Sequence, residues 1–501
     1  MKNIKRLTAV VLLFAMVFTV LTANTFAAET QPDNQTQVIA DAEYMDSVRD
    51  LIRQKYSGVI PEDALNKATT FKAMFDTLDD YSAFYDVNEI NTVLGALSGS
   101  VEGVGIQVEQ AENDKYITVL KVYKNSPAWK AGVLSGDKIA EVDGKSVAGQ
   151  SLDTVVSKVK GTVGTKVKLG LIRQGAKKIM TLEMPREQID IPTVHYELRG
   201  NIGYILIDTF SNNTYSGVDE ALEYFDSKKI TRLVLDLRNN PGGYVDQAVL
   251  VAKRFVPKGL ITKLDYKDET EMDQSYYSSL TKLKYKLTVL VNEYSASASE
   301  IFTGAVKDTD AGVIIGNKTF GKAKVQTFFP ILNKEAFIAL NQDNEVKTVN
   351  GYDFGYPFED QLSGYGKMTV GLYYTPSGEC IDLKGIEPDV KVKDNEVTAD
   401  NIPVNFLEPT TITVKPALGT QYMDVFYAEC ILKLLNYKVD KPDITLDSKT
   451  FEAIKKFQKD NKLYSYGVLD FSTQKLLNSK LQVLKQTKDP VYAKAALLLK
   501  N

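Results

Sequence analysis

The sequence predicts a multidomain protein of mixed α+β and α/β architecture, from its length and from the patterns along it. With 501 residues, the chain is longer than one hydrophobic core usually serves, so several domains are expected. Helical apolar spacing fills residues 38–97, and short alternating runs broken by glycine turns fill residues 100–186. Over residues 187–390, apolar runs typical of buried strands alternate with helical stretches, which predicts an α/β core around a largely buried sheet.

The composition excludes several classes of function. Hydrophobic residues at 44% and charged residues at 25% are typical of a soluble globular protein. A net charge of −4 argues against nucleic acid as the main partner, because the chain has no excess of cations to release counterions. The single histidine, His195, and the two cysteines lack the spacing of a zinc site, so no metal is expected. No organic cofactor is expected either.

The first residues have the pattern of a sorting signal. Lys2, Lys5 and Arg6 precede the apolar run Leu7–Ala23, and small residues follow it. This order predicts a signal peptide at residues 1–27 and therefore an exported protein. The run of 17 residues lies at the short limit for spanning a bilayer, so retention as an uncleaved anchor remains the alternative. Export without a disulfide framework indicates a bacterial cell envelope.

The block from residue 100 to 186 is punctuated by glycine turns. Its ordered elements are Gly103–Ile106 (Gly-Val-Gly-Ile), Ser126–Ala128 and Gly136–Ile139. A glycine-flanked loop that exposes successive N–H groups can hold a peptide's terminal carboxylate, and the adjoining strand can accept the peptide as an added strand. The series resembles a bacterial PDZ domain, and the resemblance implies a substrate C-terminus bound by Gly103, Val104, Gly105 and Ile106.

Arg173 closes a predicted strand that begins at Lys166. In related proteins with such a domain, a basic residue at the matching position senses engagement of the PDZ domain, so the resemblance implies a sensor role for Arg173. The alternative is an exposed arginine at the end of a strand.

Chemistry is concentrated between residues 187 and 390. Ser297 is the middle serine of Ser295–Glu300, which follows the strand-like run Leu287–Val291 and opens a helix. A nucleophile at such a turn lies near the N–H groups of the helix N-terminus, which can stabilise an oxyanion. Further along the chain lie Lys322 and Gln326, and upstream a strand ends in a tight turn with Gly242 and Gly243.

These residues and spacings resemble the carboxy-terminal processing (tail-specific) proteases over residues 38–390, together with Leu78–Ser82, Thr375–Gly378 and Gly385–Asp389. The resemblance implies a crotonase-like α/β core, a homodimer formed through the N-terminal helices, and a closed state in which the PDZ domain blocks the catalytic groove. It also implies the roles of the site residues: Ser297 as nucleophile, Lys322 as general base, Gln326 as its orienting partner, and the N–H groups of Ala298 and of Gly242 or Gly243 as the oxyanion hole. Asp308 also falls at a family position, where a structural role is expected.

A lysine base requires an unusual environment. An ordinary lysine has a pKa of ~10.4, and burial has to lower it toward ~7–8 before the amine can accept a proton at neutral pH. The surroundings of the amine are therefore expected to be apolar, with Phe320 and Val325 as walls. A histidine-based triad would need His195, which no motif links to Ser297.

Some features favour a non-catalytic interpretation. The serines could simply cap a helix, and Lys322 could be a solvated loop residue. Ala323-Lys324 replaces the Gly-Ser or Gly-Thr usual after the family's lysine, and residues 333–366 are longer than the family's usual turn. A catalytically inactive PDZ and peptidoglycan-binding scaffold is therefore the alternative to an endopeptidase.

The end of the chain is expected to form a separate small module. After a polar linker at residues 391–412, residues 413–483 resemble the three-helix peptidoglycan-binding module, and residues 484–501 are expected to be a tail helix. Ala453, Ile454 and Phe457 fall on one helix face, which would also suit any three-helix core. Peptidoglycan is accordingly the expected partner, besides protein substrates with accessible C-terminal tails, and a degenerate structural domain is the alternative.

Overall fold

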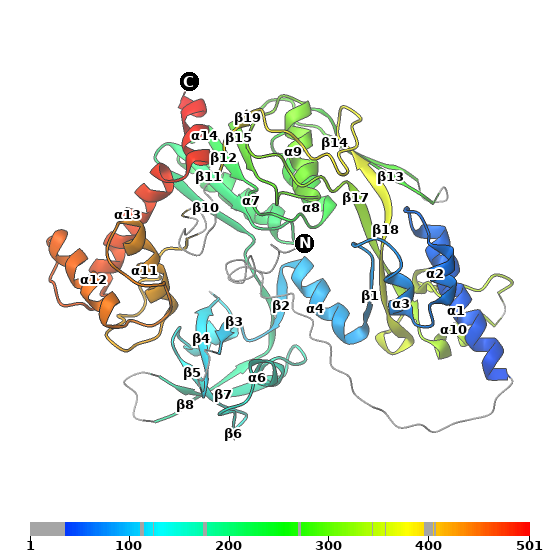
Figure 1. The fold of residues 1–501 in the computed structure, drawn as a ribbon, viewed down its shortest axis with the longest axis horizontal. Coiled ribbons are helices and arrows are strands. Elements are labelled where there is room, and N and C mark those ends of the chain that lie inside the picture. Colours follow the sequence, from blue (N-terminus) through cyan, green and yellow to red (C-terminus); the bar gives the residue numbers. More distant parts are fainter. Residues whose placement is uncertain are drawn as a thin grey trace. The chain divides into compact units, whose positions relative to one another are not determined.

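The computed structural model describes residues 36–110, 115–123, 125–173, 178–268, 272–342, 344–355, 357–394, 404 and 407–500. The expected signal peptide lies outside these residues. The described residues divide into two compact units (Figure 1). The first contains those of 99–192 and 392–500, and the second contains those of 36–98 and 193–391. Helices and sheets occur in both units, so the prediction of a multidomain α and β protein is confirmed.

The second unit contains a six-stranded sheet that is parallel except for its first pair. Its order is β10 (Val194–Arg199), β11 (Ile202–Ile207), β12 (Arg232–Asp236), β15 (Lys286–Val291), β16 (Val313–Gly316) and β19 (Val390–Lys391). Every residue of β11 is buried, as expected for a strand covered on both faces. Parallel neighbours need crossover connections. Here these contain α7 (Thr214–Ser227), α8 (Val245–Ala252) and α9 (Ala298–Asp308).

A second, antiparallel sheet of this unit carries the lysine side of the candidate site. Its long strand β18 (Leu362–Tyr374) pairs with β1 (Ala83–Asp86), β13 (Gly259–Tyr266) and β17 (Lys324–Leu332), and β14 (Gln274–Ser278) pairs with β13. The register places Gln326 opposite Thr369, and Phe328 opposite Lys367.

The N-terminal block differs from the all-helical expectation in one respect. It contains α1 (Thr36–Lys55), α2 (Glu62–Lys67), α3 (Phe71–Phe75) and α4 (Val87–Ser98), but also the strand β1. The side chains of Ile52, Leu65 and Phe75 are buried in the same core as the two sheets. The short segment of β1 becomes a strand because it pairs with β18, far along the chain, and such pairing overrides local preference.

The long segment predicted at residues 333–366 forms a small helical excursion. It contains α10 (Lys334–Leu340) and the 3₁₀ turns η3 (Gly351–Phe354) and η4 (Glu359–Gln361) before β18 begins. Asn341 is buried and its side chain donates to the carbonyls of Phe337 and Thr348, so the excursion has its own polar centre.

Residues 99–192 of the first unit form a mainly antiparallel β structure with its own core. Strands β3 (Ile106–Glu109), β4 (Ile117–Val122), β5 (Lys138–Val142), β7 (Lys166–Ile172) and β8 (Met180–Pro185) make one sheet, with β6 (Lys145–Ser146) beside β5. The strands β2 (Ser100–Gly103) and β9 (Glu187–Asp190) pair separately, and α5 (Pro127–Ala131) and α6 (Leu152–Val159) complete the block. Strand β3 lies at an edge of its sheet, since its one neighbour among the described strands is β4.

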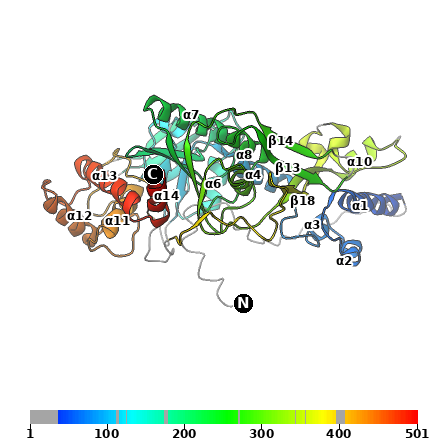
Figure 2. The ribbon, with the colours of Figure 1, turned by 90° about the horizontal axis from the view of Figure 1, so that it is seen from above.

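The C-terminal segment contains α11 (Met423–Leu434), α12 (Ser448–Asp460), α13 (Phe471–Thr487) and α14 (Pro490–Lys500), coloured orange to red (Figure 2). Ile431, Ile454, Phe457 and Leu477 share a separate apolar core. Among the described residues, no helix combines the length and apolar character needed to cross a membrane.

Candidate active site

Ser297 occupies a strained turn between β15 and α9. Its backbone has φ 54° and ψ −116°, a combination that costs a residue with a side chain free energy. Strained strand-to-helix turns of this kind present nucleophilic serines in hydrolases, because the turn exposes the hydroxyl beside the N-terminus of the helix. Ser297 is the N-cap of α9, but its left-handed φ differs from the extended backbone that an N-cap residue usually has.

The three serines of this turn differ in how their hydroxyls are used. Ser295 is buried and donates to the carbonyl of Leu237 at 2.8 Å, and Ser299 is buried and donates to the carbonyl of Asn240 at 3.0 Å. Ser297 is only half-buried, and its Oγ makes no hydrogen bond to any described residue. Of the three, the middle hydroxyl is the one that remains available for reaction.

The glycine turn after β12 lies directly against Ser297. A Cβ added to Gly242 would lie 2.8 Å from Cβ of Ser297 and 2.9 Å from the nitrogen of Ala298, so this close approach requires glycine. The N–H of Gly242 donates a hydrogen bond to Oδ1 of Asn240 at 2.9 Å, so it is not available to a substrate. The N–H groups of Gly243 and Ala298 have no acceptor among the described residues. Of the two glycines expected to contribute to an oxyanion hole, Gly243 is therefore the one with an available N–H.

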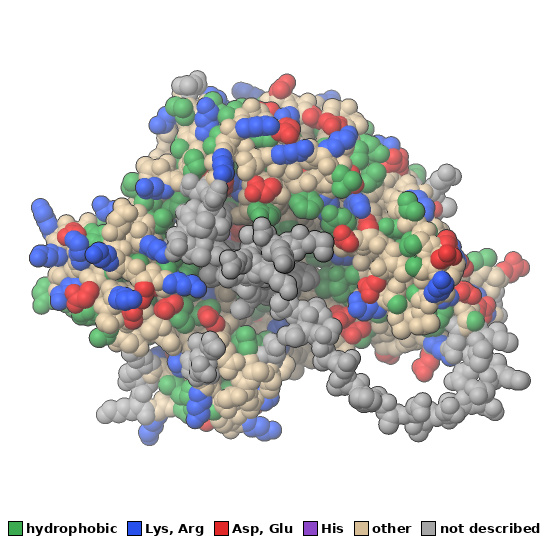
Figure 3. Space-filling model, in the orientation of Figure 1, with side chains coloured by type: hydrophobic (Ala, Val, Ile, Leu, Met, Phe, Trp, Pro, Cys, Tyr) green, Lys and Arg blue, Asp and Glu red, His purple; other side chains and the backbone are tan. Residues whose placement is uncertain are grey.

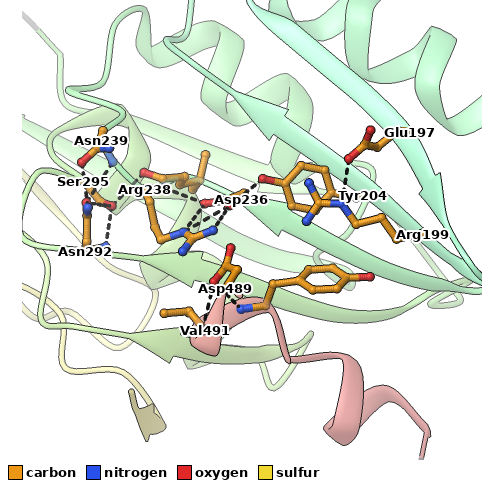
Figure 4. A network of polar contacts seen from close by, with 12 residues as sticks. Glu197, Arg199, Tyr204, Asp236, Arg238, Asn239, Asn292, Ser295, Asp489 and Val491 are labelled. Carbon is orange, nitrogen blue, oxygen red and sulfur yellow. Dashed lines mark hydrogen bonds and ion pairs between the residues drawn. The ribbon is translucent and has the colours of Figure 1, made fainter. Parts of the chain in front are cut away.

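A buried network holds the strand end from which this glycine turn starts (Figure 4). Asp236 accepts hydrogen bonds from the guanidinium of Arg238, at 2.6 Å from Nη2, and from the hydroxyl of Tyr204 at 2.7 Å. The side chains of Asn239 and Asn292 bond the turns after β12 and β15 to each other, since Nδ2 of Asn292 donates to Oδ1 of Asn239 at 2.7 Å. These contacts fix the glycine turn beside the serine turn.

Lys322 has the environment of a lysine that is partly neutral. Nζ donates to Oε1 of Gln326 at 2.9 Å and lies 4.4 Å from the centre of the Tyr81 ring. Burial lowers the pKa of Lys322 to about 8, and the positive charges of Lys367 and Lys324 act in the same direction. Near neutral pH a useful fraction of this amine can accept a proton.

Gln326 is itself held in one orientation. Its Nε2 donates to the main-chain carbonyl of Tyr81 at 2.6 Å, which leaves Oε1 as the acceptor for Lys322. Tyr81 therefore affects Lys322 in two ways: its ring lies beside the amine, and its carbonyl orients Gln326, which accepts from the amine. The wall of the amine is Tyr81 and not the expected Phe320, whose side chain is 52% exposed.

Glu300 connects the serine turn to the segment that precedes Lys322. One oxygen accepts from Oγ1 of Thr319 at 2.6 Å and from the N–H of Gly321 at 2.7 Å. The other accepts from the N–H groups of Ser297 and Lys322, both at 2.9 Å. Burial raises the pKa of Glu300, although these hydrogen bonds oppose the rise.

Tyr373 forms a second connection between the same two segments. Its hydroxyl lies 2.7 Å from the carbonyl oxygen of Lys322 and 3.0 Å from that of Ser297. The side chain is almost completely buried in β18. Glu300 and Tyr373 thus fix the backbone of Ser297 relative to the backbone of Lys322 from two sides.

Lys324, the departure from the family pattern, has its own partner. Its Nζ pairs with Oδ2 of Asp79 at 2.9 Å, and Asp79 also accepts from the hydroxyls of Ser82 and Thr369. Burial opposes ionisation of Asp79, but the hydrogen bonds from these three residues outweigh it and lower its pKa. Lys324 therefore forms an ion pair with Asp79 and does not compete with Lys322 for the side chain of Gln326.

Other residues singled out in the sequence lie elsewhere. His195 on β10 pairs with Asp208 at 2.7 Å, and no contact joins it to Ser297 among the described residues. Asp308 accepts from Oγ1 of Thr375 at 2.5 Å and from the N–H of Ser377 at 2.9 Å, which ties the end of α9 to the turn after β18.

The residues expected to bind a substrate C-terminus lie where β2 passes into β3. The carbonyls of Val104 and Gly105 accept from the N–H groups of Ala128 and Tyr123, which holds the loop against the start of α5. Arg173 makes two 2.7 Å hydrogen bonds to the carboxylate of Asp137 and a third to the carbonyl of Gly132. It is thus anchored within its own domain.

Tyr81, Glu300 and Tyr373 were not identified as site residues from the sequence. Tyr81 lies in the Leu78–Ser82 motif, which carries the resemblance but offered no role. Glu300 follows the serines at the third helical position, and a glutamate there is a recognisable capping signal. Nothing near Tyr373 in the sequence marks it, because its role depends on the pairing of β18.

Comparison with known proteins defines the class. Residues 201–392 match the model of peptidase family S41, and residues 118–173 match the model of the PDZ domain. Together with the fold and the serine turn, these matches define a serine peptidase that carries a PDZ domain.

Relatives define the family. A probable CtpA-like serine protease of Staphylococcus aureus (strain N315) is 32% identical over 463 residues, which are 92% of this chain and 85% of the relative. The carboxy-terminal processing protease CtpA of Bacillus subtilis (strain 168) is 32% identical over 508 residues and spans 100% of both chains. The chain belongs to peptidase family S41, among the CtpA-like carboxy-terminal processing proteases.

Solved structures include similar chains. The photosystem II D1 C-terminal processing protease is 26% identical, with a TM-score of 0.41 and coverage of 71% of this chain and 93% of that chain. The PDZ domain of a carboxy-terminal protease from Vibrio cholerae, solved with a peptide, is 32% identical, with a TM-score of 0.17 and coverage of 18% of this chain and 97% of that chain.

Proposed function

We propose that the protein is an endopeptidase of the cell envelope that cleaves by acyl-enzyme chemistry with Ser297 and Lys322 as a catalytic dyad. The proposal is supported by an unbonded serine hydroxyl on a strained turn and by a lysine, in the segment bound to that turn, whose pKa burial lowers to about 8. Glu300 and Tyr373 bind the backbones of both residues and so hold their main chains close to each other.

The dyad supplies each proton transfer. Neutral Lys322 takes the proton of the Ser297 hydroxyl while Oγ attacks the substrate carbonyl, and the N–H groups of Ala298 and Gly243 stabilise the oxyanion. The resulting ammonium of Lys322 gives its proton to the leaving amine. A water then attacks the acyl-enzyme with Lys322 again as base. The ammonium of Lys322 returns this proton to Oγ of Ser297 as the acyl bond breaks, and Gln326 keeps the amine oriented throughout.

A digestion experiment tests this function. Wild-type protein and the variant Ser297→Ala are incubated with casein or a tagged peptide, and the products are followed by mass spectrometry. The expected result is cleavage by wild type and none by the variant. Equal cleavage by both proteins would exclude Ser297 as the nucleophile and leave the inactive-scaffold interpretation for this site.

The PDZ block supports recognition of substrate C-termini. Strand β3 has a free edge to which a peptide can add, and the Gly103–Ile106 loop lies at the start of this strand. In this proposal Arg173 senses the bound peptide by exchanging its contacts to Asp137 and Gly132. A fluorescent peptide should lose affinity when its C-terminus is amidated, and equal affinity would contradict the proposal.

The location and the remaining partners are part of the same proposal. The basic and apolar order of residues 1–27 supports export, and the helical segment 413–483 supports attachment to peptidoglycan. The N-terminal helices α1 to α3 would form a homodimer, which size measurement of the purified protein can test.

A further inference from the structure

We propose that Lys367 is a specificity-determining residue that binds a carboxylate of the substrate beside the dyad. The inference deepens the proposed function and rests on it, because it places substrate in the site of Ser297 and Lys322. The carboxylate would belong either to an acidic side chain near the cleaved bond or to the end of the substrate chain.

The strand register places Lys367 on the sheet face that carries Gln326. Alternate residues of a strand share a face, so Lys367 and Thr369 of β18 lie on the same side. Thr369 is directly opposite Gln326, and Lys367 is directly opposite Phe328, two residues further along β17. Lys367 is therefore one step along the sheet from the glutamine that holds Lys322.

Lys367 differs from the other two lysines of the site in having no polar partner. Lys322 donates to Gln326, and Lys324 pairs with Asp79. Within the described part of the chain, the ammonium of Lys367 makes no hydrogen bond and no ion pair, and its one recorded contact is the Tyr85 ring at 5.7 Å. The side chain is nevertheless half-buried.

An unpaired, half-buried ammonium costs free energy that a carboxylate partner would offset. Burial lowers the pKa of Lys367, while the carboxylate of Asp79 acts against this. Asp79 is already bonded to Lys324, Ser82 and Thr369, so it does not serve as the partner of Lys367. The charged groups coupled to Lys367 are thus Asp79 from the Leu78–Ser82 segment and Lys322, whose pKa the charge of Lys367 lowers. Because Asp79 is occupied by other donors, the ammonium of Lys367 remains available to an incoming anion.

Aromatic rings line the same position. Tyr85 of β1 and Phe328 of β17 have ring centres 6.4 Å apart, and both side chains are half-buried. Such walls suit the apolar stem of a glutamate or aspartate side chain or of a terminal residue, with the carboxylate directed to Lys367. A bidentate guanidinium or a metal is not needed for this contact, because an ammonium binds a carboxylate as a point charge.

A peptide series tests the inference. Peptides with an amidated C-terminus carry one glutamate or one glutamine at each position around the cleavage site, and a second pair differs only in a free or amidated C-terminus. For each pair the ratio of kcat/KM values is measured with wild type, with Lys367→Gln and with Lys367→Arg. Because both peptides meet the same enzyme, ionisation of Lys322 cancels from the ratio.

At one position, or at the chain end, wild type is expected to prefer the charged peptide about tenfold, the order of a hydrogen bond to a charged group. Lys367→Gln should abolish the preference, and Lys367→Arg should keep most of it. The position that responds identifies the source of the carboxylate, an acidic side chain or the chain end. Lys263→Gln, which removes an exposed lysine on β13 of the same sheet, should leave every ratio unchanged.

Two outcomes separate this inference from the proposed function. If Ser297→Ala abolishes cleavage but no charged peptide is preferred in a manner that depends on Lys367, the dyad stands and the carboxylate site is wrong. If Ser297→Ala still cleaves, the site itself is wrong and the peptide ratios lose their basis.

Discussion

At the scale of single residues, Lys322 shows how positive charge and burial act together on one amine. Burial is the main cause of its pKa of about 8, and Lys367 and Lys324 add repulsion that further disfavours a proton. Asp79 and Glu300 act in the opposite direction. The net effect of burial and of these charges is to lower the pKa of Lys322.

The first prediction concerns the pH dependence of cleavage. A base with a pKa of about 8 should make kcat/KM rise about tenfold per pH unit below pH 8 and level off above it. Initial rates with one uncharged peptide, measured from below to above pH 8, would give the pKa of this rise in kcat/KM, the acidic limb of the pH profile. A limb near ~6.5, the ordinary pKa of histidine, would contradict a lysine base.

The second prediction concerns stability. The pKa of Lys322 is lower in the folded chain than in the unfolded chain, so the unfolded chain binds more protons between about 8 and 10.5 and stability rises with pH across that window. Below about 8 the full cost of the buried amine remains, at most about 3 kcal/mol at ~1.36 kcal/mol per pKa unit. Lys322→Met should therefore raise the free energy of unfolding at pH 7 and remove the rise in stability between about 8 and 10.5, as urea unfolding can show. Exposed Lys384→Met is the control, and a less stable Lys322→Met variant would contradict the prediction.

At the scale of elements, the N-terminal segment is joined to β17 by the ion pair of Asp79 and Lys324. Replacing Lys324 by glutamine removes a positive charge near Lys322 and releases the negative charge of Asp79, and both changes favour the protonated amine. The acidic limb of kcat/KM should therefore move to higher pH in Lys324→Gln. Asp79→Asn removes the negative charge and should move the limb to lower pH. Shifts of the same sign in both variants would indicate a purely structural role for the pair.

Tyr373 carries the fourth prediction, because it connects β18 to both catalytic segments through one hydroxyl. Tyr373→Phe removes this donor from the carbonyl oxygens of Ser297 and Lys322 and should cost about 1 kcal/mol of stability, the order of one intramolecular hydrogen bond. The small displacement of Ser297 from Lys322 should lower kcat about tenfold or more with little change in KM. Tyr374→Phe, one residue further along β18, is the matched control. An unchanged kcat in Tyr373→Phe would mean that Glu300 alone holds the two segments.

At the scale of the whole molecule, the local parts of the site could be predicted and the long-range parts could not. Ser297, Lys322 and Gln326 lie in short motifs with regular spacing, and the capping position of Glu300 is also local. Tyr81, Tyr373 and Lys367 reach the site only through the pairing of β18 with β1 and β17. Pairing between strands that are distant in the sequence, as β1 and β18 are, depends on the complete core, which a single sequence does not reveal.

The last prediction concerns attachment to the cell wall. Residues 404–501 have a separate apolar core that includes Val404 and Leu407, so a truncation has to remove both with the helices. Lysines outnumber acidic residues in this segment, and α12 alone carries Lys455, Lys456 and Lys459. Figure 3 shows blue lysine side chains on the part of the surface that belongs to the C-terminal helices. A basic surface should bind an anionic wall polymer in a manner that weakens as salt rises.

Full-length Ser297→Ala should therefore sediment with purified sacculi at low salt and less at high salt, whereas the protein that lacks residues 404–501 should stay in solution. Cleavage of a short peptide by the truncated wild type controls for folding, and undiminished sedimentation of the truncated protein would show that the wall contact lies elsewhere in the chain.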